Sequence, residues 1–333
     1  MQVQLSIVSA SLKLYQNDIN QLLEQQRLRY ELDIEYLCIV RNHQAEVIGC
    51  VGLAGRILKC FAIKEEYQGA GLSRAMITEI ILLAFQLQRK SLSIFTNPDK
   101  VAIFQSMGFT PLTTLCRHSV LLVNKPEEII ALQAQLTKTK VNGDRIAAIV
   151  INANPFTKGH ASLIEQAAKE CDWIHVFVVK EENPPFTFLD RWTMVLEGTK
   201  QIGNLTLHQG NDYIISKRTF PSYFLKNIGE VNHLHAEIDC EIFGKYIAPC
   251  LGITHRYVGS EPHCAITRNY NQVMRQILSP EIKVVEVERI VINGTCISAS
   301  TVRKQLINTT SLVTSLLPIS TINYLIEHCG YTL

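Results

Sequence analysis

The chain has 333 residues, of which 47% are hydrophobic and 19% are charged, and its formal net charge is +2. A chain of this length is too long for one ordinary hydrophobic core, so we expect two domains. Because 32 lysines and arginines are balanced by 30 aspartates and glutamates, the composition argues against a basic nucleic-acid-binding face.

The cysteines and the low-charge stretches predict a cytoplasmic setting. The ten cysteines occur singly, with no C-x-x-C pair, which favours buried and reduced thiols over metal or disulfide use. No basic segment followed by an apolar segment opens the chain, so no secretory signal is expected. The longest low-charge stretch, 305–326, is interrupted by Pro318 and several polar residues, and we therefore predict no membrane span.

The first part of the chain predicts an α+β domain. Alternating apolar segments predict strands at 4–8, 36–41, 46–53, 57–63 and 91–96. Apolar residues at helical spacing predict helices at 73–88, 100–107 and 126–138. An Asn-Gly-Asp turn at 142–144 marks the domain boundary. We therefore predict a first domain over 1–125, a helical linker over 126–143 and a second domain over 144–333.

The second part alternates strands with helices. We expect strands at 145–152, 173–179, 204–208, 233–238, 255–259 and 283–290. We expect helices at 160–171, 188–199, 221–229, 240–249 and 266–278. Continuous apolar runs such as 174–179 are typical of parallel strands buried on both faces. This pattern predicts a doubly wound α/β domain, which binds ligands beyond the carboxyl ends of its strands.

Residues 154–160, Asn-Pro-Phe-Thr-Lys-Gly-His, lie between the first strand and the first helix of this domain. A histidine at the mouth of a helix can place its ring beside the free backbone N–H groups, where the helix dipole favours a phosphate. Gly159 allows close backbone approach because it has no Cβ. These features indicate a nucleotide-handling enzyme.

Three segments resemble the nucleotidylyltransferase superfamily. Residues 157–160 match its (H/T)-x-G-H signature, and residues 297–303 match its I-S-x-S-x-x-R/K signature. Residues 180–191 resemble its loop between the second strand and the second helix. Each match alone could be accidental, and the serines could simply cap a helix with a solvated arginine. Three matches in the right order on an α/β pattern make nucleotidylyl transfer the favoured interpretation.

Four segments narrow the resemblance to the citrate lyase ligase family: 154–160, 257–262, 268–272 and 297–303. The resemblance extends over essentially the whole chain, because this family also has an N-terminal acetyltransferase-like domain. It implies that ATP and acetate form acetyl-adenylate with release of pyrophosphate. It also implies Mg²⁺ with the triphosphate. The implied acceptor is the thiol of the coenzyme-A-like prosthetic group on the acyl carrier subunit of citrate lyase.

The same resemblance implies the site residues. We assign His160 and Thr157 to phosphate oxygens, and Arg303 to the β,γ-phosphates together with Ser298 and Ser300. Lys158 and Arg191 are weaker candidates for the same charge. The other expected nucleotide contacts are Asn154, Pro155, Phe156, Gly159, Gly259, Glu261, Ile297 and Thr301. No protein nucleophile is required, and we assign no metal-ligating residue. His233 and His235 would share a face of the strand predicted at 233–238, but their spacing does not favour a metal site.

In the first domain, residues 68–73 resemble the Q/R-x-x-G-x-G/A loop of the N-acetyltransferases, with Ser73 as a mild departure. Residues 104–109 resemble the Y/F-x-x-x-G-F segment of that fold. Such a loop holds the pyrophosphate of coenzyme A on backbone amides. The domain either binds the prosthetic arm or is kept for packing, and we favour binding. The expected contacts are Gln68, Gly69, Ala70, Gly71 and Ser73.

Three other functions remain open from the sequence. The chain could be a simple adenylyltransferase that makes a dinucleotide or coenzyme. It could be an N-acetyltransferase whose second domain binds nucleotide only as a regulator. It could also be a non-catalytic partner of a carrier protein, in which case His160 would be dispensable.

Overall fold

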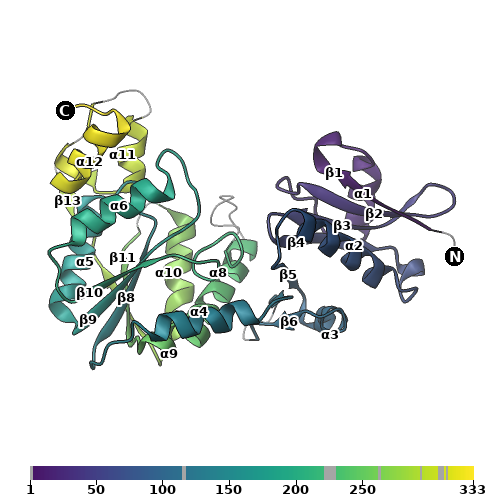
Figure 1. Ribbon diagram of the computed structural model, residues 1–333, viewed down its shortest axis with the longest axis horizontal. Helices are drawn as coiled ribbons and strands as arrows, with labels where there is room; N and C mark the ends of the chain where they lie inside the picture. The colour runs from purple at the N-terminus through teal and green to yellow at the C-terminus, as the bar shows by residue number, and fades with distance from the viewer. Residues whose placement is uncertain are drawn as a thin grey trace. The chain divides into compact units, whose positions relative to one another are not determined.

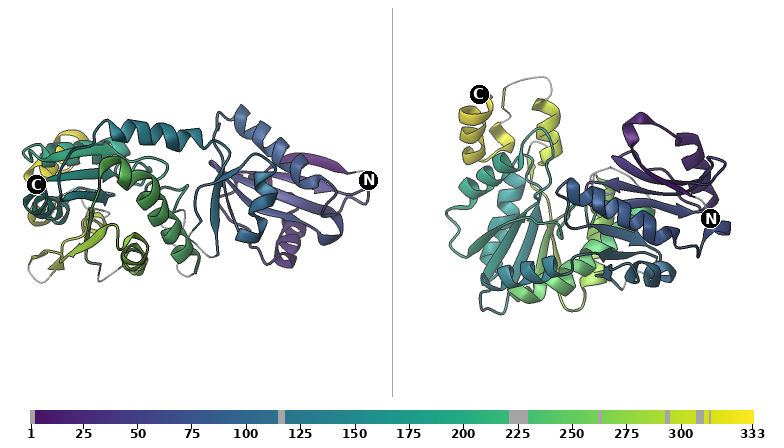
Figure 2. Two further views of the ribbon diagram at one scale, coloured as in Figure 1. Left: turned by 90° about the horizontal axis from the view of Figure 1, so that it is seen from below. Right: turned by 45° about the vertical axis from the view of Figure 1, so that its right-hand side comes forward.

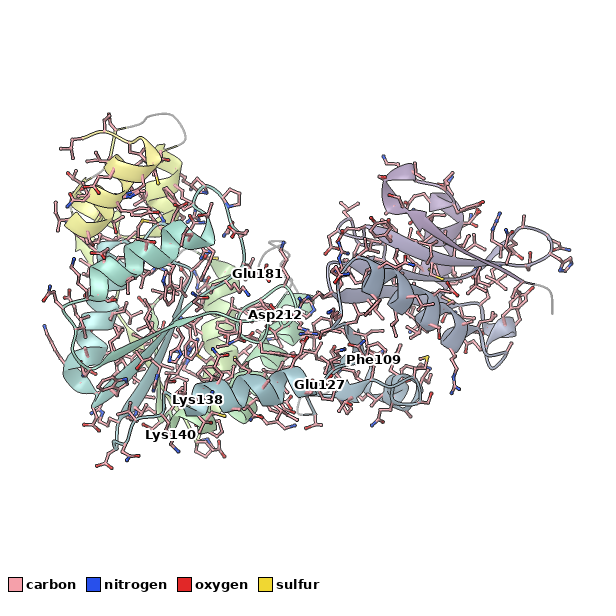
Figure 3. All side chains as sticks on the ribbon, viewed as in Figure 1. Phe109, Glu127, Lys138, Lys140, Glu181 and Asp212 are labelled. Atoms are coloured by element: carbon pink, nitrogen blue, oxygen red, sulfur yellow. The ribbon has the colours of Figure 1, made fainter. Side chains whose placement is uncertain are left out.

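The computed structural model describes residues 3–114, 118–220, 230–261, 264–292, 295–306, 311–312 and 314–333 (Figure 1). The chain forms two compact units, Met1–Glu128 and Ile129–Leu333. The division falls within α4 (Glu127–Thr137), which matches the helix expected at 126–138; Glu127 at its start and Lys138 just beyond its end are labelled in Figure 3.

A mixed sheet in the order β1-β2-β3-β4-β5-β7-β6 forms the centre of the first unit. Its strands are β1 Gln4–Ser9, β2 Tyr36–Arg41, β3 Val47–Ala54, β4 Ile57–Ile63, β5 Ser93–Thr96, β6 Thr110–Pro111 and β7 Val120–Val123. Strands β4 and β5 are parallel and pair only at Ile57–Ser93 and Leu58–Ile94, whereas the other described neighbours are antiparallel. The strands expected in this unit are confirmed, while β6 and β7 were not predicted.

Helices cover both faces of this sheet (Figure 1). The helical segments are η1 Ala10–Leu12, α1 Gln16–Gln25, η2 Glu65–Tyr67, α2 Leu72–Gln86, η3 Pro98–Lys100 and α3 Val101–Gln105. Helix α2 buries Met76, Ile77 and Ile80 on one face, and α1 buries Ile19 and Leu22 on the other. Coverage on both faces explains why every residue of β3 is buried. Helix α1 was not predicted, because most of its residues are polar.

The second unit contains a parallel sheet in the order β10-β9-β8-β11-β12, which confirms the doubly wound prediction. The strands are β8 Ile146–Ile151, β9 Trp173–Val178, β10 Leu205–Gln209, β11 His255–Gly259 and β12 Lys283–Val287. Figures 1 and 2 show helices on both sides of it. One face packs against α5 (Lys158–Glu170), α6 (Phe188–Thr199), α11 (Ala299–Leu306) and α12 (Ile319–Cys329). The opposite face packs against α4, α8 (Glu230–Ile242), α9 (Ala248–Leu251) and α10 (Ala265–Leu278).

The strand predicted at 233–238 is wrong, because this segment belongs to α8. Its apolar residues alternate with polar ones, which is the pattern typical of a strand. In the structure, however, Ala236 and Cys240 lie one helical turn apart and both face the core. Residues two apart on a helix point to different sides, so His233 and His235 do not share a face. His233 instead pairs with Glu237 at 3.4 Å, one helical turn further on. The segment expected as a helix at 240–249 is helical and includes a π-helical turn, η4, at Phe243–Ile247.

The remaining elements lie near the carboxyl end of the chain. Strand β12 ends at Val287, earlier than predicted, and the short strands β13 (Val291–Ile292) and β14 (Thr295–Cys296) pair in an antiparallel arrangement. A 3-10 turn, η5, spans Thr314–Leu316. The helix expected at 221–229 lies outside the described residues. Within the described ranges, no helix combines the length and apolar character needed to cross a membrane.

Candidate active site

The turn after β8 positions His160 on the first turn of α5. Thr157 is the N-cap residue, and its Oγ1 accepts the backbone N–H of His160 at 3.4 Å. In return, His160 Nδ1 accepts the backbone N–H of Thr157 at 3.1 Å. Because Nδ1 is an acceptor, the neutral ring carries its proton on Nε2. The reciprocal capping box therefore fixes both the orientation and the tautomer of the histidine.

His160 is a neutral hydrogen-bond donor at physiological pH. Burial and, to a smaller extent, the positive charges of Arg289 and Arg303 together lower the pKa of His160 to about 4. Its ring stacks on the fully buried ring of Phe156, with centroids 5.9 Å apart and planes within 12°. The Nε2–H group can therefore donate a hydrogen bond to an anion while the imidazole ring stays neutral.

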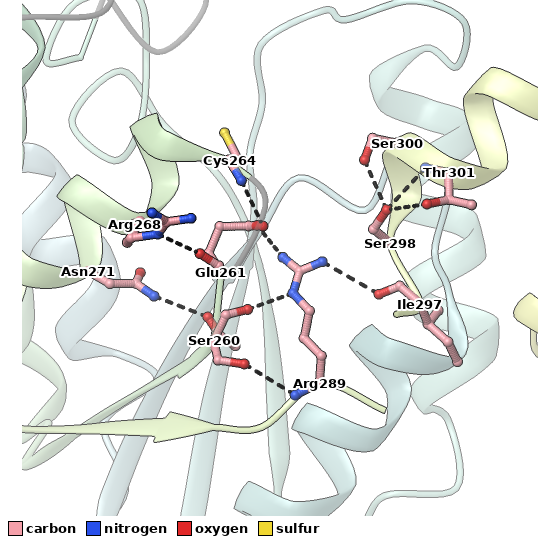
Figure 4. Close-up of polar contacts among 11 residues, drawn as sticks. Ser260, Glu261, Cys264, Arg268, Asn271, Arg289, Ile297, Ser298, Ser300 and Thr301 are labelled. Carbon is pink, nitrogen blue, oxygen red and sulfur yellow. Dashed lines mark hydrogen bonds and ion pairs between the residues drawn. The ribbon is translucent and has the colours of Figure 1, made fainter. Parts of the chain in front are cut away.

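A second helix begins beside this turn. Ser298 precedes α11, and its Oγ accepts the backbone N–H of Thr301 at 3.0 Å, as an N-cap residue does. The hydroxyls of Ser300 and Thr301 lie 2.9 and 2.8 Å from Ser298 Oγ, so three hydroxyls cluster at this helix start (Figure 4).

Two contacts bring the starts of α5 and α11 together. Arg303 of α11 donates a hydrogen bond to the main-chain carbonyl of Asn154. A Cβ placed on Gly159 would lie 3.4 Å from the carbonyl oxygen of Ile297. The first turn of α5 therefore lies directly beside the residue that precedes the serine cap. Two helix N-termini that meet in this way favour an anion by their dipoles and free N–H groups.

The end of β11 supplies a third segment. Asn271 of α10 donates to Gly259 O at 3.1 Å, and the Glu261 carboxylate accepts the Cys264 backbone N–H at 3.1 Å (Figure 4). Glu261 also forms an ion pair with Arg289, which follows β12. Sequence reasoning did not identify Arg289, because residues 283–290 were interpreted as one continuous strand.

Two predicted cationic residues bind main-chain carbonyls. Arg191 is fully buried and donates to the carbonyl oxygens of Asn152 and Val179, each at 2.8 Å, and of Glu181 at 2.7 Å. It therefore joins the carboxyl ends of β8 and β9. Lys158 Nζ donates to Ser315 O at 2.8 Å, in the turn η5. Their contact with phosphate stays a prediction.

The loops around the turn hold it in place. Asn154 Nδ2 donates to the carbonyls of Asn183 and Pro184, while its Oδ1 is buried without a partner among the described residues. The buried Pro155 follows Asn154 through a cis peptide bond. Thr321 of α12 donates to Phe156 O at 3.0 Å.

The neighbouring loops after β9 and β10 are also joined, by a 2.7 Å hydrogen bond from the Lys217 backbone N–H to Glu181. Glu181 and Asp212 mark these loops in Figure 3.

In the first unit, the glycine loop precedes α2. Gln68 Nε2 donates to Ile63 O at 3.1 Å, which ties the loop to the end of β4. Gly69 and Gly71 have φ values of +80° and +79°, which side chains with a Cβ rarely adopt. Gly71 provides no side-chain cap for α2. Ala70 is exposed and Ser73 is half-buried, so the loop presents backbone groups to solvent.

A parallel α/β sheet, a histidine in a capping box after its first strand and an adjoining serine-capped helix define a nucleotidylyltransferase-like enzyme domain. Residues 146–325 match the family described as citrate lyase ligase C-terminal domain, and residues 11–121 match the acetyltransferase (GNAT) domain. The chain belongs to the citrate lyase ligase family.

Similarity to curated relatives supports the assignment to this family. The chain is 43% identical to "[Citrate [pro-3S]-lyase] ligase" of Klebsiella pneumoniae over 93% of its own length and 92% of the relative. It is 42% identical to the protein of the same name from Escherichia coli strain K12, over 93% of its length and 91% of the relative. A 31% identical match to "Phosphopantetheine adenylyltransferase" of Staphylococcus haemolyticus strain JCSC1435 covers 21% of this chain and 44% of that protein. The resemblances stated from the sequence are therefore confirmed for both parts of the chain.

Proposed function

We propose that this chain activates acetate with ATP and acetylates the thiol of the prosthetic group on the acyl carrier subunit of citrate lyase. The similarity to two proteins named citrate lyase ligase, over more than nine-tenths of all three chains, carries this proposal. The shorter match to an adenylyltransferase leaves most of this chain, including the acetyltransferase-like unit, without an explanation.

The proposed reaction has two steps. A carboxylate oxygen of acetate attacks the α-phosphorus of ATP, the bond to the bridging oxygen breaks, and pyrophosphate leaves. The thiol then attacks the acetyl carbonyl and loses its proton, and AMP departs as the thioester forms. Negative charge develops on phosphoryl oxygens in the first step, so positioned donors supply most of the catalysis.

The described residues support this chemistry with donors at one place. We assign the Nε2–H of His160 and the first N–H groups of α5 to the α-phosphate. We assign Ser298, Ser300 and Thr301 with Arg303 to the β,γ-phosphates, because hydroxyls and a guanidinium gather where α11 begins.

Mg²⁺ would neutralise charge on the phosphates. The described residues contain no cluster of three or more His, Cys, Asp or Glu side chains suited to a metal. We propose that phosphate oxygens and water hold most of the ion, as Mg²⁺ prefers.

We assign the first domain to binding the coenzyme-A-like arm of the carrier subunit through residues 68–71 and Ser73. Two φ-positive glycines and an uncapped helix start support this role.

We keep the domain division at 1–125, 126–143 and 144–333. We propose a cytoplasmic location, which agrees with the free thiols of eight of the cysteines within the described ranges.

The test is ATP–pyrophosphate exchange by the purified protein, with and without acetate. We expect acetate-dependent exchange, and a loss of about 3 kcal/mol of transition-state stabilisation in His160→Ala. His43→Ala is the matched control, because His43 is exposed in the other unit. Near-normal exchange by His160→Ala would contradict the assignment of His160 to the α-phosphate. Exchange that requires a phosphorylated pantetheine in place of acetate would make the chain a simple adenylyltransferase.

A further inference from the structure

Arg289 lies where three segments of the candidate active site meet. Its Nε donates to Ser260 O at 2.6 Å, and its Nη2 pairs with the Glu261 carboxylate (Figure 4). Its Nη1 donates to Ile297 O at 3.5 Å, and its backbone N–H donates to Ser260 Oγ at 3.3 Å. We call these four residues, Ser260, Glu261, Arg289 and Ile297, the Arg289 clasp.

The acceptors in the clasp belong to two different parts of the site. Ser260 and Glu261 follow β11, and Glu261 also caps the start of α10 through the Cys264 N–H. Ile297 directly precedes the serine cap of α11, and its carbonyl borders Gly159. The clasp therefore links the end of β11 to the start of α11, at the point where α11 meets α5.

The clasp is partly shielded from water. The side chains of Glu261 and Arg289 are 8% and 22% exposed. A carboxylate with so little exposure needs a charged or hydrogen-bonding partner, because an unpaired buried charge is costly. Arg289 meets this need with a planar fork of donors, which the single ammonium of a lysine does not reproduce.

We propose that Arg289 is a positioning residue for nucleotide binding, which holds the hydroxyl cluster at the start of α11 against the histidine turn of α5. This inference rests on the proposed function for its substrate, ATP. The positive charge of Arg289 also depresses the pKa of His160, so the guanidinium lies within electrostatic reach of the histidine. A displacement of about 1 Å between phosphate-binding groups can cost about 100-fold in rate.

The experiment compares Arg289→Ala, Arg289→Lys, Glu261→Gln and the double variant Arg289→Ala/Glu261→Gln. Arg275→Gln is the matched control, because Arg275 of α10 pairs with Glu286 of β12 without any contact to the clasp. Calorimetric titration with ATP, and separately with inorganic pyrophosphate, measures binding without acetate. Exchange kinetics give kcat and KM, and urea unfolding shows which variants are folded.

We expect Arg289→Ala to weaken ATP binding about tenfold and to reduce kcat/KM for exchange about 100-fold. Arg289→Lys should not restore binding. The double variant should be no worse than Arg289→Ala, because residues that act as a unit are not additive. The pKa of His160, followed by NMR, should rise in Arg289→Ala because one of its neighbouring positive charges is gone.

Wild-type ATP affinity and kcat/KM in folded Arg289→Ala would overturn the inference. Additive losses in the double variant, or an equal loss in Arg275→Gln, would overturn it as well. If the wild type binds ATP but shows no acetate-dependent exchange, the proposed function fails on its own. The binding comparison with Arg289→Ala then still decides the role of the clasp.

Discussion

Two buried histidines should make the second unit unstable in mild acid. His175 on β9 is fully buried, His208 on β10 is 9% exposed, and His175 Nδ1 lies 2.9 Å from His208 Nε2. The pKa of each ring is lowered to about 4, by burial for His208 and by burial together with the neighbouring His208 for His175. His175 Nε2 has no partner among the described residues, and a charged His175 ring carries a proton on both nitrogens, so the Nε2 proton of the charged ring would be buried without an acceptor.

The sign of the effect follows from proton linkage. An unfolded histidine has a pKa of about 6.5, so the unfolded chain binds more protons than the folded chain between pH 6.5 and 4. Stability is therefore complete above about pH 6.5 and is lost as the pH falls. A pKa shift of about 2.5 units corresponds to about 3 kcal/mol for each histidine. Over the whole interval from pH 6.5 to 4, the two histidines together should lower the free energy of unfolding by about 6 kcal/mol. This is comparable to the whole stability of a domain.

Urea unfolding followed by tryptophan fluorescence measures this effect, because both tryptophans, Trp173 and Trp192, belong to the second unit. We compare the free energy of unfolding at pH 7.5, 6.0 and 5.0. These values lie above the pH range in which protonation of carboxylates such as Asp190, whose pKa is lowered, begins to destabilise the fold. The double variant His175→Leu/His208→Leu should show a flatter pH dependence than the wild type, and exposed His43→Leu should not. An equally steep decline in the double variant, or no decline in the wild type, would refute the reasoning.

Two further predictions concern the supports of the active-site turn. Arg191→Met should lower the free energy of unfolding by about 3–5 kcal/mol, because it leaves three carbonyls at and beyond the ends of β8 and β9 without their shared donor, and each unsatisfied buried acceptor costs about 1–3 kcal/mol. Lys200→Gln, which removes an exposed pair with Glu197, should stay within about 1 kcal/mol of the wild type in the same urea assay, and equal losses would contradict the role of Arg191. Gly198→Ala places a Cβ 2.4 Å from the Phe156 ring, so it should cost about 1–3 kcal/mol and weaken ATP binding. Gly203→Ala, with open space around its Cβ, is the control for thermal unfolding and calorimetry, and a neutral Gly198→Ala would contradict the packing argument.

Most of the architecture was predictable because its signals are local. Apolar runs of strand length between helical periodicities predicted the parallel sheet, and the described strands β8 to β12 lie at the expected places. The segment 154–160 predicted a strand-to-helix turn, and Thr157 begins α5 as a capping residue. Alternation failed at 233–238, because a helix that packs one face on α10 can carry apolar residues two apart.

The sequence by itself determined the two-part organisation, the α/β pattern and the motifs that resemble citrate lyase ligase. These properties depend on neighbouring residues, on side-chain period and on turn chemistry. Only the tertiary structure decided that Arg191 joins two strand ends, that His175 meets His208 and that Arg289 links β11 to α11. Such contacts join residues that are 8 to 39 positions apart in the sequence. Strand register and helix packing bring these residues together, and the local sequence pattern does not specify which distant residues will meet.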